Sequence, residues 1–274
     1  MIYLAAVVLG VVQGLTEFLP VSSSAHLILA RVFFGWDAGR LGLAFDVACH
    51  VGTLAAVVAY FRADLVELAR AVPGLARAPL WPADGPGRRL RLMAVGTVPV
   101  AVVGLLFADQ IEHTLRSPWV AVASLAIVAA CFLAVERAGA GTRGEDTLSA
   151  PAAFAIGVAQ AAALVPGVSR SGATITTGML AGLRRDQAAR FSFVLGVPAV
   201  MAAALHEGLD LFRTGLGAAD AGLFLVGMAV SGAVGFVTIK YLLKYLASHT
   251  LAVFAWYRIA LAAAAALWMA GGRG

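Results

Sequence analysis

Long apolar segments alternate with short polar ones along most of this chain. Six of the segments are long enough to cross a hydrocarbon layer about 30 Å thick, which takes on the order of 20 residues of helix. We place them, with approximate ends, at Leu43–Phe61, Leu92–Ala108, Trp119–Val135, Phe191–Leu205, Ala221–Ile239 and Leu251–Met269. The pattern predicts an all-α integral membrane protein with six transmembrane helices.

Two further apolar regions, at about 1–35 and 150–183, are interrupted in the middle. Pro20 is followed by Val-Ser-Ser-Ser, and Pro166 by Gly-Val-Ser-Arg-Ser. Proline breaks the helical hydrogen-bond ladder, and lipid cannot satisfy the backbone groups that become free. Each break must therefore be buried in protein or line a wet cavity, so we expect two re-entrant helical hairpins.

Composition agrees with the apolar pattern. The chain is 61% hydrophobic and 13% charged, whereas soluble domains are roughly 45–50% apolar and about 25% charged. We expect a single transmembrane domain over residues 1–274. The net charge of +5 could suggest a nucleic-acid partner. Because the arginines lie mainly between apolar segments, as in the positive-inside pattern, we expect the bilayer and no nucleic acid.

Arginine distribution also predicts orientation. The loop at 62–91 is the most basic and is expected to be cytoplasmic; it holds Arg62, Arg70, Arg77, Arg88, Arg89 and Arg91. Each half of the chain, at about 1–136 and 150–270, is then one hairpin plus three spans. A hairpin returns to the side it entered from, so each half crosses the membrane three times, an odd number. Equivalent segments of the two halves should therefore cross in opposite directions, as an inverted-topology repeat. Gln13 and Ser22 lie nine residues apart, as do Gln160 and Ser169.

The first interruption carries an acidic motif, which runs from Gln13 to His26 as QGLTEFLPVSSSAH. Gln13 and Glu17 are four residues apart and so share a helix face. A carboxylate in an apolar segment is costly and by default indicates function. Its oxygens, with those of Gln13, suit magnesium or calcium. The alternative is a neutral Glu17 bonded to Gln13, with Ser22 and its neighbours only capping a helix.

The second interruption carries a basic motif, VPGVSRSGATIT, with one arginine in an otherwise uncharged stretch. Arg170 and the N–H groups at a helix start, together with the hydroxyls of Ser169, Ser171 and Thr174 and that of Ser22 from the first motif, form an anion site suited to phosphate. The alternative is that Arg170 only pairs with Glu17. Inverted halves would bring both motifs together, which favours phosphoryl transfer assisted by a divalent cation.

Other polar candidates are weaker. Asp46 and His50 share a helix face near the end of a span, and could steer lipid headgroups or only bond to each other. His206-Glu207 lacks the second histidine of the H-E-x-x-H zinc motif, so zinc protease chemistry is not expected.

The motifs QGLTEFLPVSSSAH and VPGVSRSGATIT, together with FDVACHVGTLAAV and ARFSFVLGVPAV, resemble the undecaprenyl-diphosphate phosphatase family, also called bacitracin-resistance proteins. The resemblance implies hydrolysis of undecaprenyl diphosphate to undecaprenyl phosphate and phosphate, which recycles the lipid carrier of cell-wall synthesis and confers bacitracin resistance. It also implies a divalent cation, Mg²⁺ or Ca²⁺. The site would open to the outer face of a bacterial plasma (inner) membrane.

By that resemblance six residues fall on functional positions of the family: Glu17, Ser23, His26, Ser169, Arg170 and Thr174. Gln13 stands where many relatives carry glutamate, so the metal site holds one negative charge fewer. The nucleophile stays open between Ser23, His26 and water, as do the cation, the prenyl chain length and the assembly, including a homodimer. A lipid-phosphate transporter or flippase is the alternative function, because inverted repeats around a midplane anion site would serve it equally well.

Overall fold

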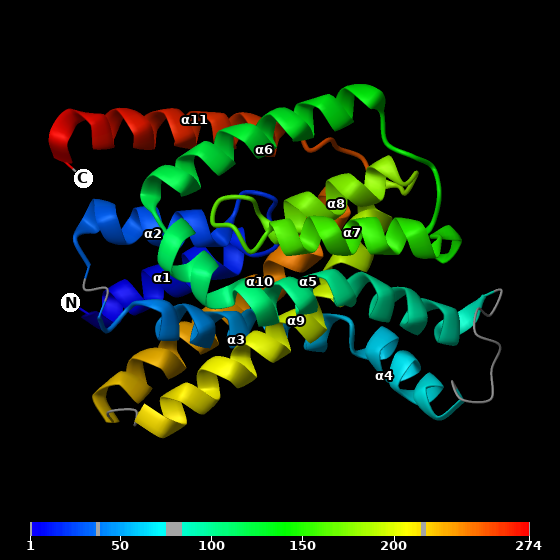
Figure 1. The fold of residues 1–274 in the computed structure, drawn as a ribbon, viewed down its shortest axis with the longest axis horizontal. Coiled ribbons are helices and arrows are strands. Elements are labelled where there is room, and N and C mark those ends of the chain that lie inside the picture. The colour runs from blue at the N-terminus through cyan, green and yellow to red at the C-terminus, as the bar shows by residue number, and fades with distance from the viewer. Residues whose placement is uncertain (1, 37–38, 75–83, 215–217, 274) are drawn as a thin grey trace.

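The computed structural model describes residues 2–36, 39–74, 84–214 and 218–273, and within these ranges the regular structure is helical (Figure 1). Arg77 of the basic loop lies outside them. The α-helices are α1 Ile2–Thr16, α2 Ser23–Phe34, α3 Leu43–Tyr60, α4 Arg62–Ala71, α5 Gly85–Leu115, α6 Pro118–Ala138, α7 Ala150–Ala162, α8 Arg170–Leu180, α9 Arg185–Thr214, α10 Ala218–Leu246 and α11 Ala252–Trp268. Short helical turns η1 Val72–Gly74, η2 Glu145–Thr147 and η3 Met269–Arg273 complete the described chain.

Among the described residues, six helices are long and apolar enough to cross a membrane, which confirms the predicted spans. They are α3, α5, α6, α9, α10 and α11. The spans of α5 and α9 continue through Pro99 and Pro198, so these internal prolines do not end a helix as Pro20 and Pro166 do. The protein is a multi-pass membrane protein.

Both predicted interruptions are present. The chain leaves α1 at Thr16 and begins α2 at Ser23, and it leaves α7 at Ala162 and begins α8 at Arg170. The residue before each new helix has a left-handed backbone, with φ of 75° at Ser22 and 73° at Ser169. Among the described residues these are the two non-glycine residues with positive φ. Such conformations cost about 1–3 kcal/mol and cluster at functional sites.

Small residues let the interrupted helices pack closely against neighbouring helices of the bundle. A Cβ added to Gly14 of α1 would lie 2.8 Å from the Ser231 carbonyl oxygen of α10, and one added to Gly157 of α7 would lie 2.3 Å from the Gly96 carbonyl oxygen of α5. Close backbone approach through small residues is the usual packing between membrane helices. In Figure 1 the α1–α2 and α7–α8 pairs lie between α6 and α11 on one side and α3, α5, α9 and α10 on the other.

Candidate active site

Glu17 follows α1 directly and is only 7% exposed. Its Oε2 accepts hydrogen bonds from Gln13 Nε2 at 3.0 Å and from Ser23 Oγ at 2.8 Å. Its Oε1 accepts one from Arg170 Nη2 at 2.7 Å. His50 Nε2 of α3 lies 3.3 Å from Oε2. The two motifs, distant in sequence, therefore meet at one carboxylate.

The contact between Arg170 and Glu17 is the ion pair that the sequence left as an alternative to phosphate binding. A buried pair of this kind contributes little net stability, so its presence does not assign Arg170 a purely structural role. Gly196 of α9 makes room for it, because a Cβ there would lie 1.5 Å from Arg170 Nη1. This glycine is a site-shaping residue that the sequence analysis missed.

A narrow cleft runs beside this ion pair, between α3 and α9. Glu17 and Arg170 supply its charged groups, and its other lining residues are mostly apolar: Phe18, Thr53, Leu54, Val57, Phe193, Gly196, Val197 and Val200. The cleft is tight, with a cavity volume of about 10 Å³. Charged groups with an apolar wall beside them suit a substrate that joins a phosphate to a hydrocarbon chain.

The serines of the two motifs differ in what they bond. Ser169 Oγ accepts from the backbone N–H of Gly172 at 3.2 Å and so caps α8. Ser22 also precedes a helix, but its side chain makes no capping bond; its Oγ instead meets Ser24 Oγ at 3.2 Å. The expectation that Ser22 caps α2 through its side chain is therefore wrong, since the hydroxyl turns to Ser24.

Several hydroxyls hold the two interruptions against each other. Ser171 Oγ donates to the Leu19 carbonyl at 3.3 Å, and Ser24 Oγ accepts from the Gly167 N–H at 3.4 Å. Thr174 Oγ1 donates to the Arg170 carbonyl at 2.7 Å and also contacts Ser192 Oγ of α9. The hydroxyls of Ser171 and Thr174 thus bond carbonyl or hydroxyl groups, whereas the Ser23 hydroxyl bonds the carboxylate of Glu17.

Arg258 of α11 is fully buried and lies outside both motifs. Its guanidinium donates to the carbonyl of Pro20 at 3.4 Å and to that of Gly167 at 2.7 Å, and it stacks on Phe132 with its carbon 5.2 Å from the ring centroid. It therefore ties the first interruption to the second. A lone arginine inside the last apolar segment was the signal that could have revealed it.

The two histidines near the site are each fixed through a backbone carbonyl. His26 Nδ1 lies 2.7 Å from the Ser22 carbonyl oxygen, and its Nε2 lies 2.8 Å from Tyr257 Oη. His50 Nδ1 lies 2.8 Å from the Asp46 carbonyl oxygen, which turns its Nε2 toward Glu17. The sequence treated His50 as a weak candidate, and the structure brings it to the acid.

The side chain of Asp46 does not reach His50. It forms ion pairs with Arg31 of α2 and, at 2.5 Å, with Arg116, which follows α5. Asp46 thus joins three segments of the bundle. The expectation that Asp46 and His50 bond to each other holds only for the Asp46 backbone, because arginines occupy the carboxylate.

A divalent cation would need oxygen ligands at this site. Gln13 Oε1 is buried and has no hydrogen-bond partner, while Nε2 of the same amide donates to the Glu17 carboxylate, which also accepts from Ser23. An unpartnered amide oxygen next to a carboxylate fits a hard cation. The described residues contain no cluster of three or more His, Cys, Asp or Glu side chains that could hold a metal. Substrate oxygens would therefore have to complete the coordination.

A network of charges joins α4 and η2 to the N-terminal parts of α5 and α9. Arg89 pairs with Asp64 at 2.8 Å and with Glu145 at 3.0 Å, and Arg190 also pairs with Asp64 at 3.0 Å. Burial raises the pKa of Glu145 above its ordinary value. Burial also acts to raise the pKa of Asp64, but hydrogen bonding and charge from Arg89 and Arg190 outweigh it and leave that pKa low.

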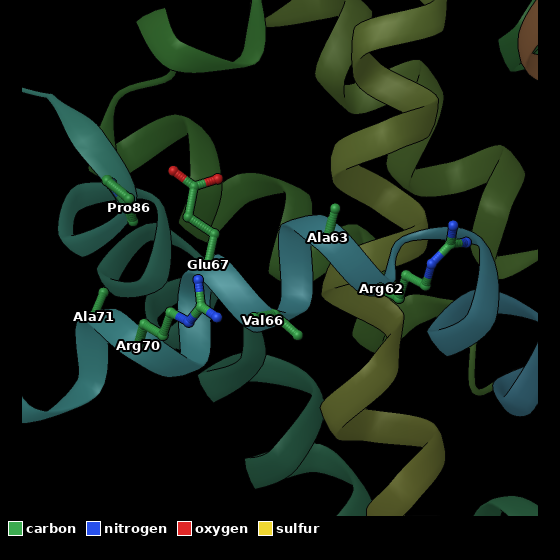
Figure 2. A pocket seen from close by; sticks show the side chains of 7 residues that line it. All are labelled: Arg62, Ala63, Val66, Glu67, Arg70, Ala71 and Pro86. Atoms are coloured by element: carbon green, nitrogen blue, oxygen red, sulfur yellow. The ribbon is translucent and has the colours of Figure 1, made fainter.

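A second pocket lies on this side of the molecule, between α4 and the start of α5 (Figure 2). Its lining residues are Arg62, Ala63, Val66, Glu67, Arg70, Ala71 and Pro86. None of them belongs to either motif, so this pocket is separate from the site at Glu17.

Comparison of the sequence with known proteins identifies its family. The family model described as "Bacitracin resistance protein BacA" matches residues 6–264. The undecaprenyl-diphosphatase of Rubrobacter xylanophilus is 49% identical over 262 residues, which cover 95% of this chain and 96% of that protein. Those of Geotalea daltonii and Thermomicrobium roseum are 44% and 43% identical, each over 93% of this chain and 94% of the relative. The chain belongs to the bacitracin resistance protein BacA family.

Proposed function

We propose that this protein is a membrane phosphatase that hydrolyses undecaprenyl diphosphate to undecaprenyl phosphate and inorganic phosphate. This activity recycles the lipid carrier of cell-wall synthesis and confers resistance to bacitracin. The names of its relatives support the substrate. The observation that carries the chemistry is that one carboxylate, Glu17, bonds both the hydroxyl of Ser23 and the guanidinium of Arg170.

Ser23 is the nucleophile in this proposal, and Glu17 is its base. A serine hydroxyl at 2.8 Å from a carboxylate oxygen has the spacing of an activated nucleophile and its base. Ser23 Oγ attacks the terminal phosphorus while Glu17 takes the hydroxyl proton, and the bond to the bridging oxygen breaks to release undecaprenyl phosphate. Water then cleaves the phosphoryl-serine bond, releasing phosphate and restoring the hydroxyl. Attack by His26 or by water are the alternatives that experiment must exclude.

Arg170 holds the terminal phosphate in this scheme. Its guanidinium is 18% exposed and lies at the start of α8, where free backbone N–H groups add to its positive charge. To bind phosphate it exchanges Glu17 for phosphate oxygens, which frees the carboxylate to act as a base. The helix cap at Ser169 keeps this helix start in place.

A divalent cation, Mg²⁺ or Ca²⁺, is proposed at Gln13 and Glu17. When bound, it would neutralise charge on the phosphate oxygens. Gln13 would contribute its buried Oε1, which has no protein partner, and Glu17 would contribute a carboxylate oxygen. Because Gln13 is neutral, the protein supplies one negative charge and leaves the phosphate to supply the others.

The α1–α2 and α7–α8 pairs are proposed to be re-entrant hairpins of an inverted repeat. Two observations support it: α1 packs on α10 as α7 packs on α5, and Ser22 and Ser169 share one unusual backbone conformation. The basic loop at 62–91 then faces the cytoplasm, and the site opens to the outer face of the plasma membrane.

The experiment is phosphate release from C15 and C55 prenyl diphosphates by the purified protein in nanodiscs, with and without a chelator. Release that stops with chelator and returns with Mg²⁺ or Ca²⁺ is expected. Absence of release, combined with movement of lipid phosphate across proteoliposomes, would replace the phosphatase with a transporter or flippase.

A further inference from the structure

Tyr257 reaches the site from α11, far from both motifs in sequence. Its Oη lies 2.8 Å from His26 Nε2. The two rings are nearly parallel, with an interplanar angle of 5° and centroids 5.6 Å apart. One side chain thus fixes both the plane of the imidazole and the atom at its free end, although Tyr257 itself is 46% exposed.

The hydrogen bonds define where the imidazole proton is. The partner of Nδ1 is the Ser22 carbonyl oxygen, at 2.7 Å, and a carbonyl can only accept a hydrogen bond. Nδ1 therefore carries a hydrogen. In the neutral ring, Nε2 then has the lone pair, so the Tyr257 hydroxyl is the donor to it. The charged side chain that follows Tyr257, Arg258, is directed at the backbone carbonyls of Pro20 and Gly167.

We propose, on the basis of the phosphatase function above, that Tyr257 is a positioning residue for His26. Its phenol holds the imidazole in the Nδ1–H tautomer and keeps Nε2 as the ring atom that accepts a proton. In the scheme above, the water that cleaves the phosphoryl-serine bond must lose a proton, and His26 lies on the same helix as Ser23, one turn away.

The kinetic test is Tyr257→Phe, which removes the hydroxyl and keeps the stacked ring. We expect kcat to fall about tenfold, a fraction of the 10²–10⁴ that a proton-transfer group supplies, with KM for a C15 diphosphate changed less than about twofold. In a His26→Gln background the same change should cost nothing further. Tyr241→Phe is the matched control, since Tyr241 lies 62% exposed on α10 and should keep wild-type kcat.

A second readout needs no turnover. Nitrogen-15 NMR of protein labelled at histidine separates protonated from unprotonated ring nitrogens, and the His26→Gln variant identifies the signal of His26. The neutral wild-type ring should be protonated at Nδ1, and Tyr257→Phe should shift the Nε2 signal or mix the two tautomers. An unaltered His26 spectrum in Tyr257→Phe, or a wild-type ring protonated at Nε2, would overturn the proposal. A wild type that releases no phosphate would refute the phosphatase instead and leave the NMR result standing.

Discussion

The two interruptions have similar backbone conformations but carry different side chains. Ser22 and Ser169 have φ values within a few degrees of each other and each precedes a short helix. Four residues after Gln13 stands Glu17, whereas four residues after Gln160 stands Leu164. Gln13 bonds the acid, while both amide atoms of the buried Gln160 have no partner. One interruption carries the acid, serine and histidine, and the other carries the arginine.

This difference indicates a division of labour between two similar backbones. In the proposed mechanism, the first interruption supplies the groups that react, and the second supplies the groups that hold the anion. Variants at equivalent or facing positions can test that division.

Glu17→Gln should have the largest effect, because it removes the base while keeping the shape of the side chain. We expect kcat to fall by roughly 10³ or more, with substrate binding retained because Arg170 remains. The measurement is single-turnover phosphate release together with equilibrium binding of a C15 diphosphate. Activity within tenfold of wild type would show that Glu17 is not the base.

Gly196→Ala should come next. The added methyl group would occupy the place of Arg170 Nη1, so the guanidinium must move, and a displacement of about 1 Å can cost about 10²-fold in rate. Gly104→Ala on α5, where a Cβ meets nothing within 4 Å, is the control. Thermal unfolding of Gly196→Ala in an Arg170→Ala background should show no added destabilisation, since the methyl group then has room. Wild-type turnover in Gly196→Ala would contradict the placement of the arginine.

Arg170→Lys should be nearly as damaging as Arg170→Ala, because a planar fork is replaced by a point charge. We expect both variants to lose more than about tenfold in kcat/KM, a change of about 1.4 kcal/mol. Steady-state kinetics on the C15 diphosphate would measure it. A lysine variant that keeps more than about a tenth of wild-type turnover would mean that Arg170 acts by charge alone.

Gln13→Glu should strengthen cation binding at the first interruption. It adds a second carboxylate beside Glu17, which favours a hard divalent cation. Two neighbouring carboxylates also repel, so one should hold a proton when no cation is bound. We therefore expect the variant to need several-fold less Mg²⁺ or Ca²⁺ at pH 8, with the advantage shrinking toward pH 5.5. An unchanged requirement in an active variant would remove Gln13 from the metal site.

The smallest expected effect is on unfolding temperature, when the serines that precede α2 and α8 are replaced in turn. Ser169→Ala loses the cap on the Gly172 N–H, whereas Ser22→Ala loses no cap. A lost cap costs about 1 kcal/mol, so Ser169→Ala should unfold at a temperature roughly 2–4 °C below that of Ser22→Ala. Equal unfolding temperatures would show that the Ser169 cap contributes no stability.

The sequence predicted the six spans and both interruptions, because hydrocarbon thickness and proline sterics act locally. It also predicted from helical spacing that Gln13 and Glu17 share one face, where the structure shows them hydrogen-bonded. The sequence did not predict the roles of Arg258 and Gly196, because these depend on which helices pack together. The ion pairs of Asp46 were not predicted for the same reason, because Arg31 and Arg116 come from other segments. The contact of Ser22 with Ser24 is local, and the sequence pattern does not show that this hydroxyl bonds Ser24 instead of capping α2.

The stereochemistry of phosphoryl transfer tests most directly whether the phosphoryl group passes through a covalent enzyme intermediate, as a Ser23 nucleophile requires. A C15 prenyl diphosphate made chiral at the terminal phosphorus with sulfur and oxygen isotopes would be hydrolysed in isotopically labelled water, and the configuration of the released thiophosphate determined. Transfer to Ser23 and then to water inverts the phosphorus twice, so the predicted result is overall retention. Overall inversion would mean a single direct attack by water and would contradict a serine nucleophile in the first interruption.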